Sequence, residues 1–313
     1  MNSPDSSTDL TPKRPLTRRR FLKRTGLGLL AGGAASTVYG HWMEPSWLDV
    51  DEVTLPFQAL PVDRPVTILH LSDLHHSSQV SINQIDDAVQ LGLKHKPDLV
   101  ALTGDFVTRL RQNGDIYAES EAYSDVLKQL SAVAPTFACL GNHDGSHKNI
   151  NSPHGFKSAR HIVNMLKRAG VTLLQNKRQT VTLGNGAEVD VAGVGDLWEK
   201  ECEPYKALAP RSQPSSESTP KRPVIVLAHN PDCKDSMRGF DWDLQLSGHT
   251  HGGQVRVPLI NWAPVVNVED RRFVEGLHEW EGRYLYITRG VGNLMGFRFS
   301  CRPQVSVLRA GMK

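Results

Sequence analysis

The chain has 313 residues with 36 Lys and Arg against 33 Asp and Glu, which gives a formal net charge of +3. Seven of the basic and two of the acidic residues lie within the first 24 positions, so the remaining chain carries 29 basic and 31 acidic side chains. This distribution disfavours a basic, nucleic-acid-binding body. A hydrophobic content of 39% and a mean hydropathy of −0.36 disfavour an integral membrane protein.

The N-terminal segment has the pattern of an export signal. Arg18 and Arg19 precede Phe21-Leu22-Lys23, and a mildly apolar stretch follows at 26–39. That stretch is too short and too rich in glycine to span roughly 30 Å of hydrocarbon comfortably. The motif resembles a twin-arginine (Tat) signal, so we predict residues 1–40 to be a leader for the Tat export machinery. The expected destination is the periplasm or the outer face of the cytoplasmic membrane. A basic, disordered tail that touches acidic membranes or nucleic acid is the alternative, and cleavage of the leader stays open.

Strands and helices alternate in the first half of the chain, after a connecting segment at 41–64. Short apolar runs predict strands at 66–71, 98–102, 136–140 and 171–174. Apolar residues at helical spacing predict helices at 82–94, 119–132 and 161–169. This alternation is typical of βαβ units with parallel strands.

The second half is richer in strands. The glycines of Gly184-Asn185-Gly186 predict a hairpin between strands at 180–183 and 188–194. Further strands are expected at 224–228, 244–246 and 284–288, with one short helix near 232–237 and a surface loop at 204–223. The fold class is therefore α/β, a layered sandwich in which residues 65–313 form a single domain.

Polar clusters follow five of these strands. They supply the side chains that bind metals: Asp73 with His75, Asp105, Asn142 with His143 and Asp144, His229, and His249 with His251. Ligands of α/β folds gather beyond the carboxyl ends of strands, so we expect the five clusters to build one metal site. In an extended segment residues i and i+2 point the same way, which would turn both His249 and His251 towards that site.

The five clusters together resemble the calcineurin-like metallophosphoesterase superfamily over about residues 65–300. More narrowly, the leader and the segments 73–76, 195–198, 228–232 and 288–292 are similar to the exported bacterial phosphodiesterases of the YaeI and YkuE type. The resemblance implies a four-layer β-sandwich flanked by helices, with two metal ions at the strand ends. It also implies a hydrolase that acts on phosphoric esters.

The resemblance further implies which residues bind the ions. Asp73, His75 and His251 would hold the first, Asn142, His229 and His249 the second, and Asp105 would bridge both. A shared carboxylate offsets the repulsion between cations about 3.5–4 Å apart. Mixed imidazole, carboxylate and amide ligation suits Mn²⁺, Fe or Zn²⁺ better than Ca²⁺ or Mg²⁺. We expect two divalent ions per chain, with Mn²⁺ preferred.

The expected reaction is hydrolysis of a phosphodiester by a hydroxide that the two metals activate. His143 lies outside the implied ligand set and is expected to stabilise the developing charge or protonate the leaving group. Asp144 is expected to hold the other ring nitrogen of His143, as a carboxylate orients a catalytic imidazole. Hydrogen bonding within the turn is the alternative role for both residues.

The substrate is less constrained than the reaction. We expect a small-molecule or lipid phosphodiester and no nucleic acid. The apolar segment 255–262, which contains Trp262, is either a core hairpin or a lip for an acyl chain and for peripheral membrane contact. Two other functions remain as alternatives: a lipid-linked pyrophosphate hydrolase of the UDP-diacylglucosamine type, and a non-catalytic metal-binding envelope protein.

Overall fold

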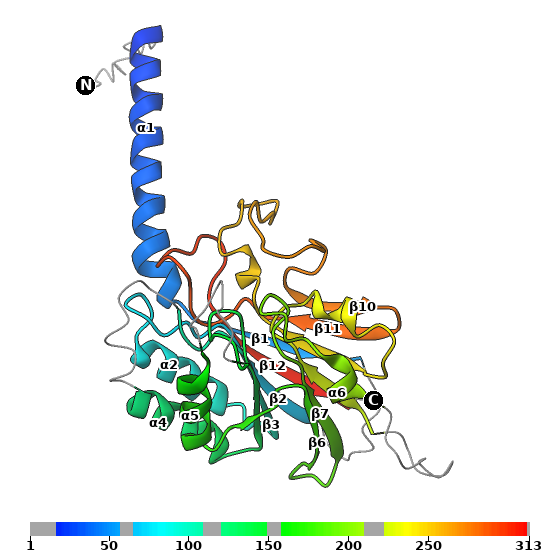
Figure 1. Ribbon diagram of the computed structural model, residues 1–313. Helices are drawn as coiled ribbons and strands as arrows, with labels where there is room; N and C mark the ends of the chain where they lie inside the picture. The colour runs from blue at the N-terminus through cyan, green and yellow to red at the C-terminus, as the bar shows by residue number, and fades with distance from the viewer. Residues whose placement is uncertain (1–16, 57–64, 109–119, 149–157, 210–221, 312–313) are drawn as a thin grey trace, which may run out of the picture.

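Two six-stranded β-sheets form the centre of the protein in a computed structural model that describes residues 17–56, 65–108, 120–148, 158–209 and 222–311 (Figure 1). The first sheet contains, in spatial order, β1 (Asp49–Thr54), β12 (Gln304–Ala310), β2 (Val66–Leu71), β3 (Leu99–Thr103), β4 (Thr136–Cys139) and β5 (Thr172–Leu173). The second contains β10 (Gly276–Trp280), β11 (Arg283–Ile287), β9 (Leu244–Ser247), β8 (Val224–Leu227), β7 (Glu188–Gly193) and β6 (Lys177–Thr182).

Helices cover the outer faces of both sheets. The first sheet packs against α2 (Ile82–Leu93), α4 (Ser120–Ser131) and α5 (Arg160–Arg168) through one continuous apolar cluster. The second sheet packs in the same way against the short helices α6 (Pro204–Leu208) and α7 (Cys233–Ser236). The order helix, sheet, sheet, helix confirms the predicted four-layer sandwich in a single domain.

The space between the sheets is filled by a third apolar cluster. Ile68 and Leu99 of the first sheet belong to it together with Val189 and Leu244 of the second. Strands covered on both faces need apolar residues in succession, which explains why the predicted strands read as continuous hydrophobic runs. Strands β2, β3 and β4 run parallel, as do β7, β8 and β9, so their carboxyl ends share one edge of each sheet.

The strands and helices that we predicted are present, with ends that differ by a few residues. Strands β1, β10 and β12 were not expected. The segment 41–64 is more than a connection, because its residues Asp49–Thr54 form edge strand β1 beside β12. The predicted loop 204–223 begins with helix α6, and residues 210–221 lie outside the described part of the chain.

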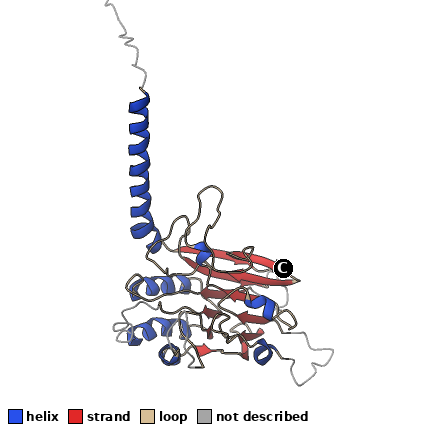
Figure 2. Ribbon diagram, turned by 45° about the horizontal axis from the view of Figure 1, so that its top comes forward, coloured by secondary structure: helices blue, strands red, loops and turns tan. Residues whose placement is uncertain are grey.

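Helix α1 (Arg18–Val38) stands away from the body, and none of its residues is buried (Figures 1 and 2). Among the described residues, no helix combines the length and the apolar character needed to cross a membrane. The base of α1 continues into η1 (Tyr39–Met43) and η2 (Glu44–Ser46), which are joined to the body. The buried carboxylate of Glu44 accepts hydrogen bonds from the backbone N–H groups of Ser300, at 2.9 Å, and Cys301.

Candidate metal centre

The five strand-end clusters meet in one place. Asp73 and His75 follow β2, Asp105 follows β3 and Asn142 follows β4, while His229 follows β8 and the remaining two histidines follow β9. Hydrogen bonds and ion pairs connect the side chains of all seven predicted ligands: Asp73, His75, Asp105, Asn142, His229, His249 and His251. All seven side chains are buried, so this is an enclosed centre rather than a surface cluster.

One group of candidate ligands consists of Asp73, His75 and His251, the three residues that the resemblance implies for the first ion. The Nε2 atom of His251 lies 3.3 Å from Oδ1 of Asp73 and 3.0 Å from Nε2 of His75. These three side chains offer ligand atoms within the reach of a single cation. A carboxylate with two imidazoles is a common donor set for first-row divalent metals.

Asp105 joins this group to the second one. Its Oδ2 atom lies 3.5 Å from Nε2 of His75 and 3.2 Å from Nε2 of His229. The Oδ1 atom of Asn142 lies 3.2 Å from that His229 nitrogen and 2.9 Å from Nδ1 of His249. Asp105 therefore occupies the position between the groups that a bridging ligand requires.

Backbone carbonyls fix the tautomers of two of these histidines. A carbonyl oxygen only accepts, so Nδ1 of His229 must donate to the oxygen of Thr103 at 2.7 Å, and Nε2 of His249 must donate to that of Asn267 at 3.0 Å. The other ring nitrogens, His229 Nε2 and His249 Nδ1, face each other at 3.2 Å beside the oxygens of Asp105 and Asn142. Such a convergence of acceptors needs a positive charge at its centre, and a divalent cation fits that need.

The protonation of the ligands also favours a cation. Burial opposes the ionisation of Asp105, but His229, His143 and His75 together outweigh burial and hold the pKa of this carboxyl well below its usual value. Burial lowers the pKa of His249 to about 4. For His229, burial lowers the pKa of the ring, but the carboxylates of Asp105, Asp73 and Asp196 together outweigh burial and raise that pKa. A metal ion bound at Nε2 of His229 would replace the proton that the neighbouring carboxylates otherwise favour there.

Most of the ligands sit in an unusual backbone conformation. The φ angles of Asp73, His75, Asp105, His249 and His251 are all positive, between 48° and 68°. This region is unfavourable for residues other than glycine, and such strain tends to gather at functional sites. The prediction that His249 and His251 lie in an extended segment is therefore wrong. They lie in tight turns, which direct His249 to the second group and His251 to the first.

The predicted contact between Asp144 and the ring of His143 is absent. The Asp144 carboxylate instead accepts three backbone N–H groups, from Asp105, Phe106 and Gly141, at 2.7–2.9 Å. Nδ1 of His143 is buried and has no hydrogen-bond partner among the described residues. Asp144 thus holds the turns that carry Asp105 and Asn142, and the correction assigns it a positioning role.

Two contacts of the ligands could not be foreseen from the sequence. The hydroxyl of Thr108 lies 2.7 Å from Nδ1 of His75. The buried guanidinium of Arg298 donates to the backbone carbonyls of Arg289 and Gly292 and lies 3.4 Å from Nδ1 of His251. Threonine and arginine are frequent in any sequence, and only the fold brings these two to the centre.

A comparison with protein families matches residues 66–253 to the calcineurin-like phosphoesterases. The chain belongs to the calcineurin-like phosphoesterase family. All seven ligands of the centre lie within the matched residues. Membership in this family, together with the Asp and His groups of the structure, identifies the protein as a hydrolase of phosphoric esters that uses divalent metals.

Individual relatives agree with the family. The chain is 42% identical to the phosphodiesterase YaeI of Escherichia coli over 94% of its own length and 98% of that protein. It is 27% identical to the uncharacterized metallophosphoesterase YkuE of Bacillus subtilis, covering 94% and 97% of the two chains. The UDP-2,3-diacylglucosamine pyrophosphatase LpxG of Chlamydia trachomatis is 26% identical, with 90% and 94% covered.

Proposed function

We propose that this protein is a metal-dependent phosphodiesterase. The observation that carries the proposal is the position of Asp105, whose Oδ2 atom lies within 3.5 Å of His75 and 3.2 Å of His229, between two buried groups of metal ligands. Two-metal centres of this kind hydrolyse phosphoric esters. The 42% identity to a protein named as a phosphodiesterase favours diesters over other phosphoric esters.

The residues of the centre divide the chemistry between them. Divalent ions held by the seven ligands would neutralise the phosphoryl oxygens and lower the pKa of a water from about 16 towards neutrality. His143 lies beside the ligands, with its ring centroid 5.1 Å from that of His75. Burial lowers the pKa of His143, so a neutral imidazole is available as an N–H donor to the leaving oxygen.

Manganese is the metal that we propose. The donor set combines four imidazoles, two carboxylates and one amide. Oxygen-rich sites suit Mg²⁺ and Ca²⁺, whereas imidazole with carboxylate suits Mn²⁺, Fe and Zn²⁺. Elemental analysis of protein purified from cells grown with each metal would decide among these three.

Neither alternative function is favoured. The lipid-linked pyrophosphatase has 26% identity to the chain, well below the 42% of the phosphodiesterase. A non-catalytic metal-binding protein does not require His143, which the chain keeps beside a complete set of ligands. The natural diester is proposed to be a small molecule or a lipid, not a nucleic acid, because the body of the protein lacks an excess of basic residues.

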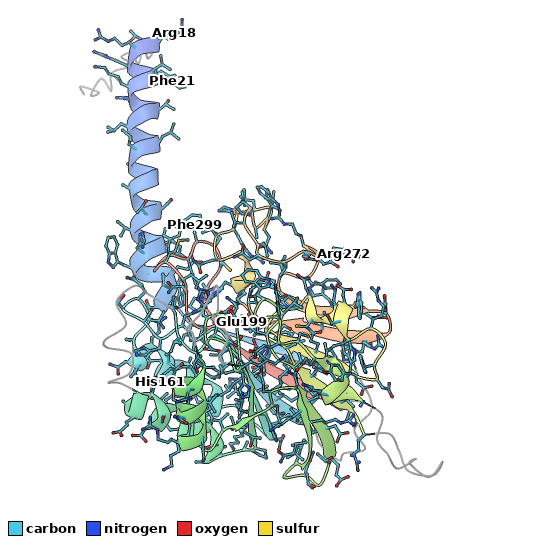
Figure 3. The ribbon with its side chains drawn as sticks, in the orientation of Figure 1. Arg18, Phe21, His161, Glu199, Arg272 and Phe299 are labelled. Carbon is cyan, nitrogen blue, oxygen red and sulfur yellow. The ribbon has the colours of Figure 1, made fainter. Side chains whose placement is uncertain are left out.

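We also propose that residues 1–40 direct the chain to the Tat machinery and that it works in the periplasm or at the outer face of the cytoplasmic membrane. The exposed Arg18 and Arg19 at the far end of α1 support this proposal, since a receptor can reach them (Figure 3). Replacing both arginines with lysine should leave the protein in the cytoplasm of a bacterial host. Export of that variant at the normal level would contradict the proposal.

The decisive activity experiment uses two chromogenic esters. Protein loaded with Mn²⁺, Fe or Zn²⁺ should hydrolyse bis-p-nitrophenyl phosphate faster than the monoester p-nitrophenyl phosphate. The variant Asn142→Ala, which removes one ligand of the second group, should lose both the activity and part of the bound metal. Absence of diester hydrolysis with all three metals would favour the non-catalytic alternative.

A further inference from the structure

A hairpin of apolar residues projects from the metal centre. The N–H of Val257 donates to the carbonyl of Trp262 at 2.9 Å and closes the hairpin, with Leu259 and Ile260 at its tip. The side chain of Leu259 is fully exposed and that of Ile260 is 68% exposed. The prediction of a core hairpin at 255–262 is therefore wrong, and the alternative of an outward-facing lip remains.

Side-chain hydrogen bonds hold the base of the hairpin, although the side chains at its tip are exposed. The buried guanidinium of Arg256 donates to the carbonyl of Gly252 at 2.7 Å and to the side chain of Asn261 at 2.8 Å. Leu259 itself has a φ angle of 72°, a conformation that is unfavourable for a leucine. Exposed apolar side chains and a strained backbone at the tip both cost free energy in the isolated chain. We therefore expect a partner that covers the tip.

Neighbouring segments extend the apolar surface. The backbone N–H of Leu294 donates to the side chain of Gln254 at the foot of the hairpin, and the ring of His41 donates to the carbonyl of Gly296 at 2.8 Å. These contacts place Met295 and Trp42, both more than 70% exposed, along one side of the molecule. We call this surface the apolar rim; its exposed side chains are Leu259, Ile260, Trp262, Val265, Met295 and Trp42.

The rim lies on the side of the body from which α1 departs (Figures 1 and 2). Figure 3 shows Phe299 near the base of α1, next to the rim. Arg272 lies farther from α1, on the loops at the other side of the rim.

We propose that the apolar rim docks on an anionic lipid bilayer. Residues 257–268 contain no charged side chain, so the rim matches an apolar partner, and the exposed Arg271, which donates to the carbonyls of Ala263 and Pro264 at 3.0 Å, supplies attraction for acidic headgroups. Exposed tryptophans such as Trp42 and Trp262 are typical of surfaces that rest at the membrane–water interface.

Docking would set the metal centre beside the headgroup layer. The segment that forms the rim begins directly after His251 and returns at Asn267, whose carbonyl accepts the Nε2–H of His249. Gly253 packs directly against Ala263 within the same segment. Both ends of the lipid-contacting segment are thus attached to metal ligands. The docking surface is independent of the proposed activity, because it depends on side chains outside the centre.

A fluorescence experiment with the full chain tests the location of the contact. A polarity-sensitive fluorophore on the variant Leu259→Cys should shift to the blue when phosphatidylcholine vesicles containing phosphatidylglycerol are added, and lipids with brominated chains should quench it. Val133→Cys is the matched control, since Val133 is 56% exposed and follows α4 on the helical layer of the first sheet. The unaltered chain, taken through the same labelling, corrects for its own cysteines. No shift at position 259, or an equal shift at position 133, would overturn the proposal.

A second experiment separates docking from catalysis. The double variant Leu259→Ser, Ile260→Ser should sediment with these vesicles at least about tenfold less, because the contact loses the transfer free energy of two large apolar side chains. Val133→Ser should sediment normally. Hydrolysis of soluble bis-p-nitrophenyl phosphate should be unchanged in all of these proteins, so inactivity of the enzyme leaves the docking result intact. Undiminished binding by the double variant, or equal binding to purely zwitterionic vesicles, would contradict docking of the rim on anionic lipid.

Discussion

The ring of His229 donates a 2.7 Å hydrogen bond from Nδ1 to the backbone carbonyl oxygen of Thr103, the last residue of β3. His229 follows a strand of the second sheet and Thr103 ends a strand of the first, so the bond joins the two sheets at the metal centre. The same bond leaves Nε2 free to bind a metal ion. One side chain therefore serves both the fold and the chemistry.

The variant His229→Asn should separate these two contributions. An asparagine amide reaches the position of Nδ1 and can still donate to Thr103, but it has no counterpart of Nε2. Loss of a residue that only hydrogen-bonds to a metal ligand usually lowers metal affinity by roughly 10–100-fold. Because His229→Asn removes a ligand itself, metal affinity should fall by more than that. The free energy of unfolding of the metal-free protein should change by about 1 kcal/mol or less. Metal analysis and urea unfolding measure the two effects, with the exposed His161→Asn as control. Full metal content in His229→Asn would contradict its assignment as a ligand.

His143 and Asp144 should behave differently although they are adjacent. The variant His143→Ala should lose about 100-fold or more in kcat and keep its metals, because His143 lies outside both ligand groups. Asp144→Asn should lower the free energy of unfolding by about 1–3 kcal/mol, since an amide cannot accept all three backbone N–H groups. Steady-state kinetics and thermal unfolding of both variants provide the comparison. Equal stability losses in the two variants would show that this division of roles is incorrect.

The metal centre leaves no room for a side chain at Gly248. A Cβ atom at this position would lie 2.0 Å from both Oδ2 of Asp73 and Oγ of Ser72. Gly248→Ala should therefore destabilise the protein by about 1–3 kcal/mol and displace a metal ligand, with loss of metal and of activity. Gly184→Ala is the control, because nothing lies within 4 Å of its Cβ position. Normal metal content in Gly248→Ala would mean that the turn adapts without moving Asp73.

Glu44 should be needed for the stability of the body even though it lies close to the leader. Its buried carboxylate accepts the N–H groups of Ser300 and Cys301. Glu44→Ala leaves both donors without a partner and should cost about 1–3 kcal/mol in urea unfolding. Glu52→Ala, at an ion pair with Arg309 that is half exposed, should cost far less than Glu44→Ala, because solvent screens the pair. If both variants were equally stable, residues 40–46 would not belong to the folded unit.

Asp270 should contribute a stability that depends on pH. The hydrogen bond from Arg272 lowers the pKa of Asp270 to about 2, below the unfolded value of about 3.9. The ionised form is thus favoured by folding, so its contribution is present above about pH 4 and is lost as the pH falls towards 2. Solvent screening limits it to about 1 kcal/mol or less. Urea unfolding of the unaltered chain and Asp270→Asn should therefore differ at pH 7 and converge only near pH 2. A constant difference across this range would exclude the ion pair as its cause.

The sequence alone determined most of the metal centre. Periodic apolar residues predicted the central strands, and the polar residues after five of them predicted the seven candidate ligands that the structure brings together. This succeeded because the signals are local: a buried parallel strand reads as an apolar run, and the edge at which it ends is where ligands gather. The leader and its destination remain predictions.

Tertiary structure decided the features that depend on distant partners. Strand β1 exists through pairing with β12, more than 250 positions away, so its own residues gave no clear signal. The sequence suggested an extended segment for His249 and His251, but packing imposed left-handed turns on both. The same packing gave Asp144 three backbone donors in place of the His143 ring. Every residue has a backbone carbonyl, so the acceptor of His229, the carbonyl of Thr103, cannot be recognised from its residue type. Only the folded chain shows how each histidine is oriented.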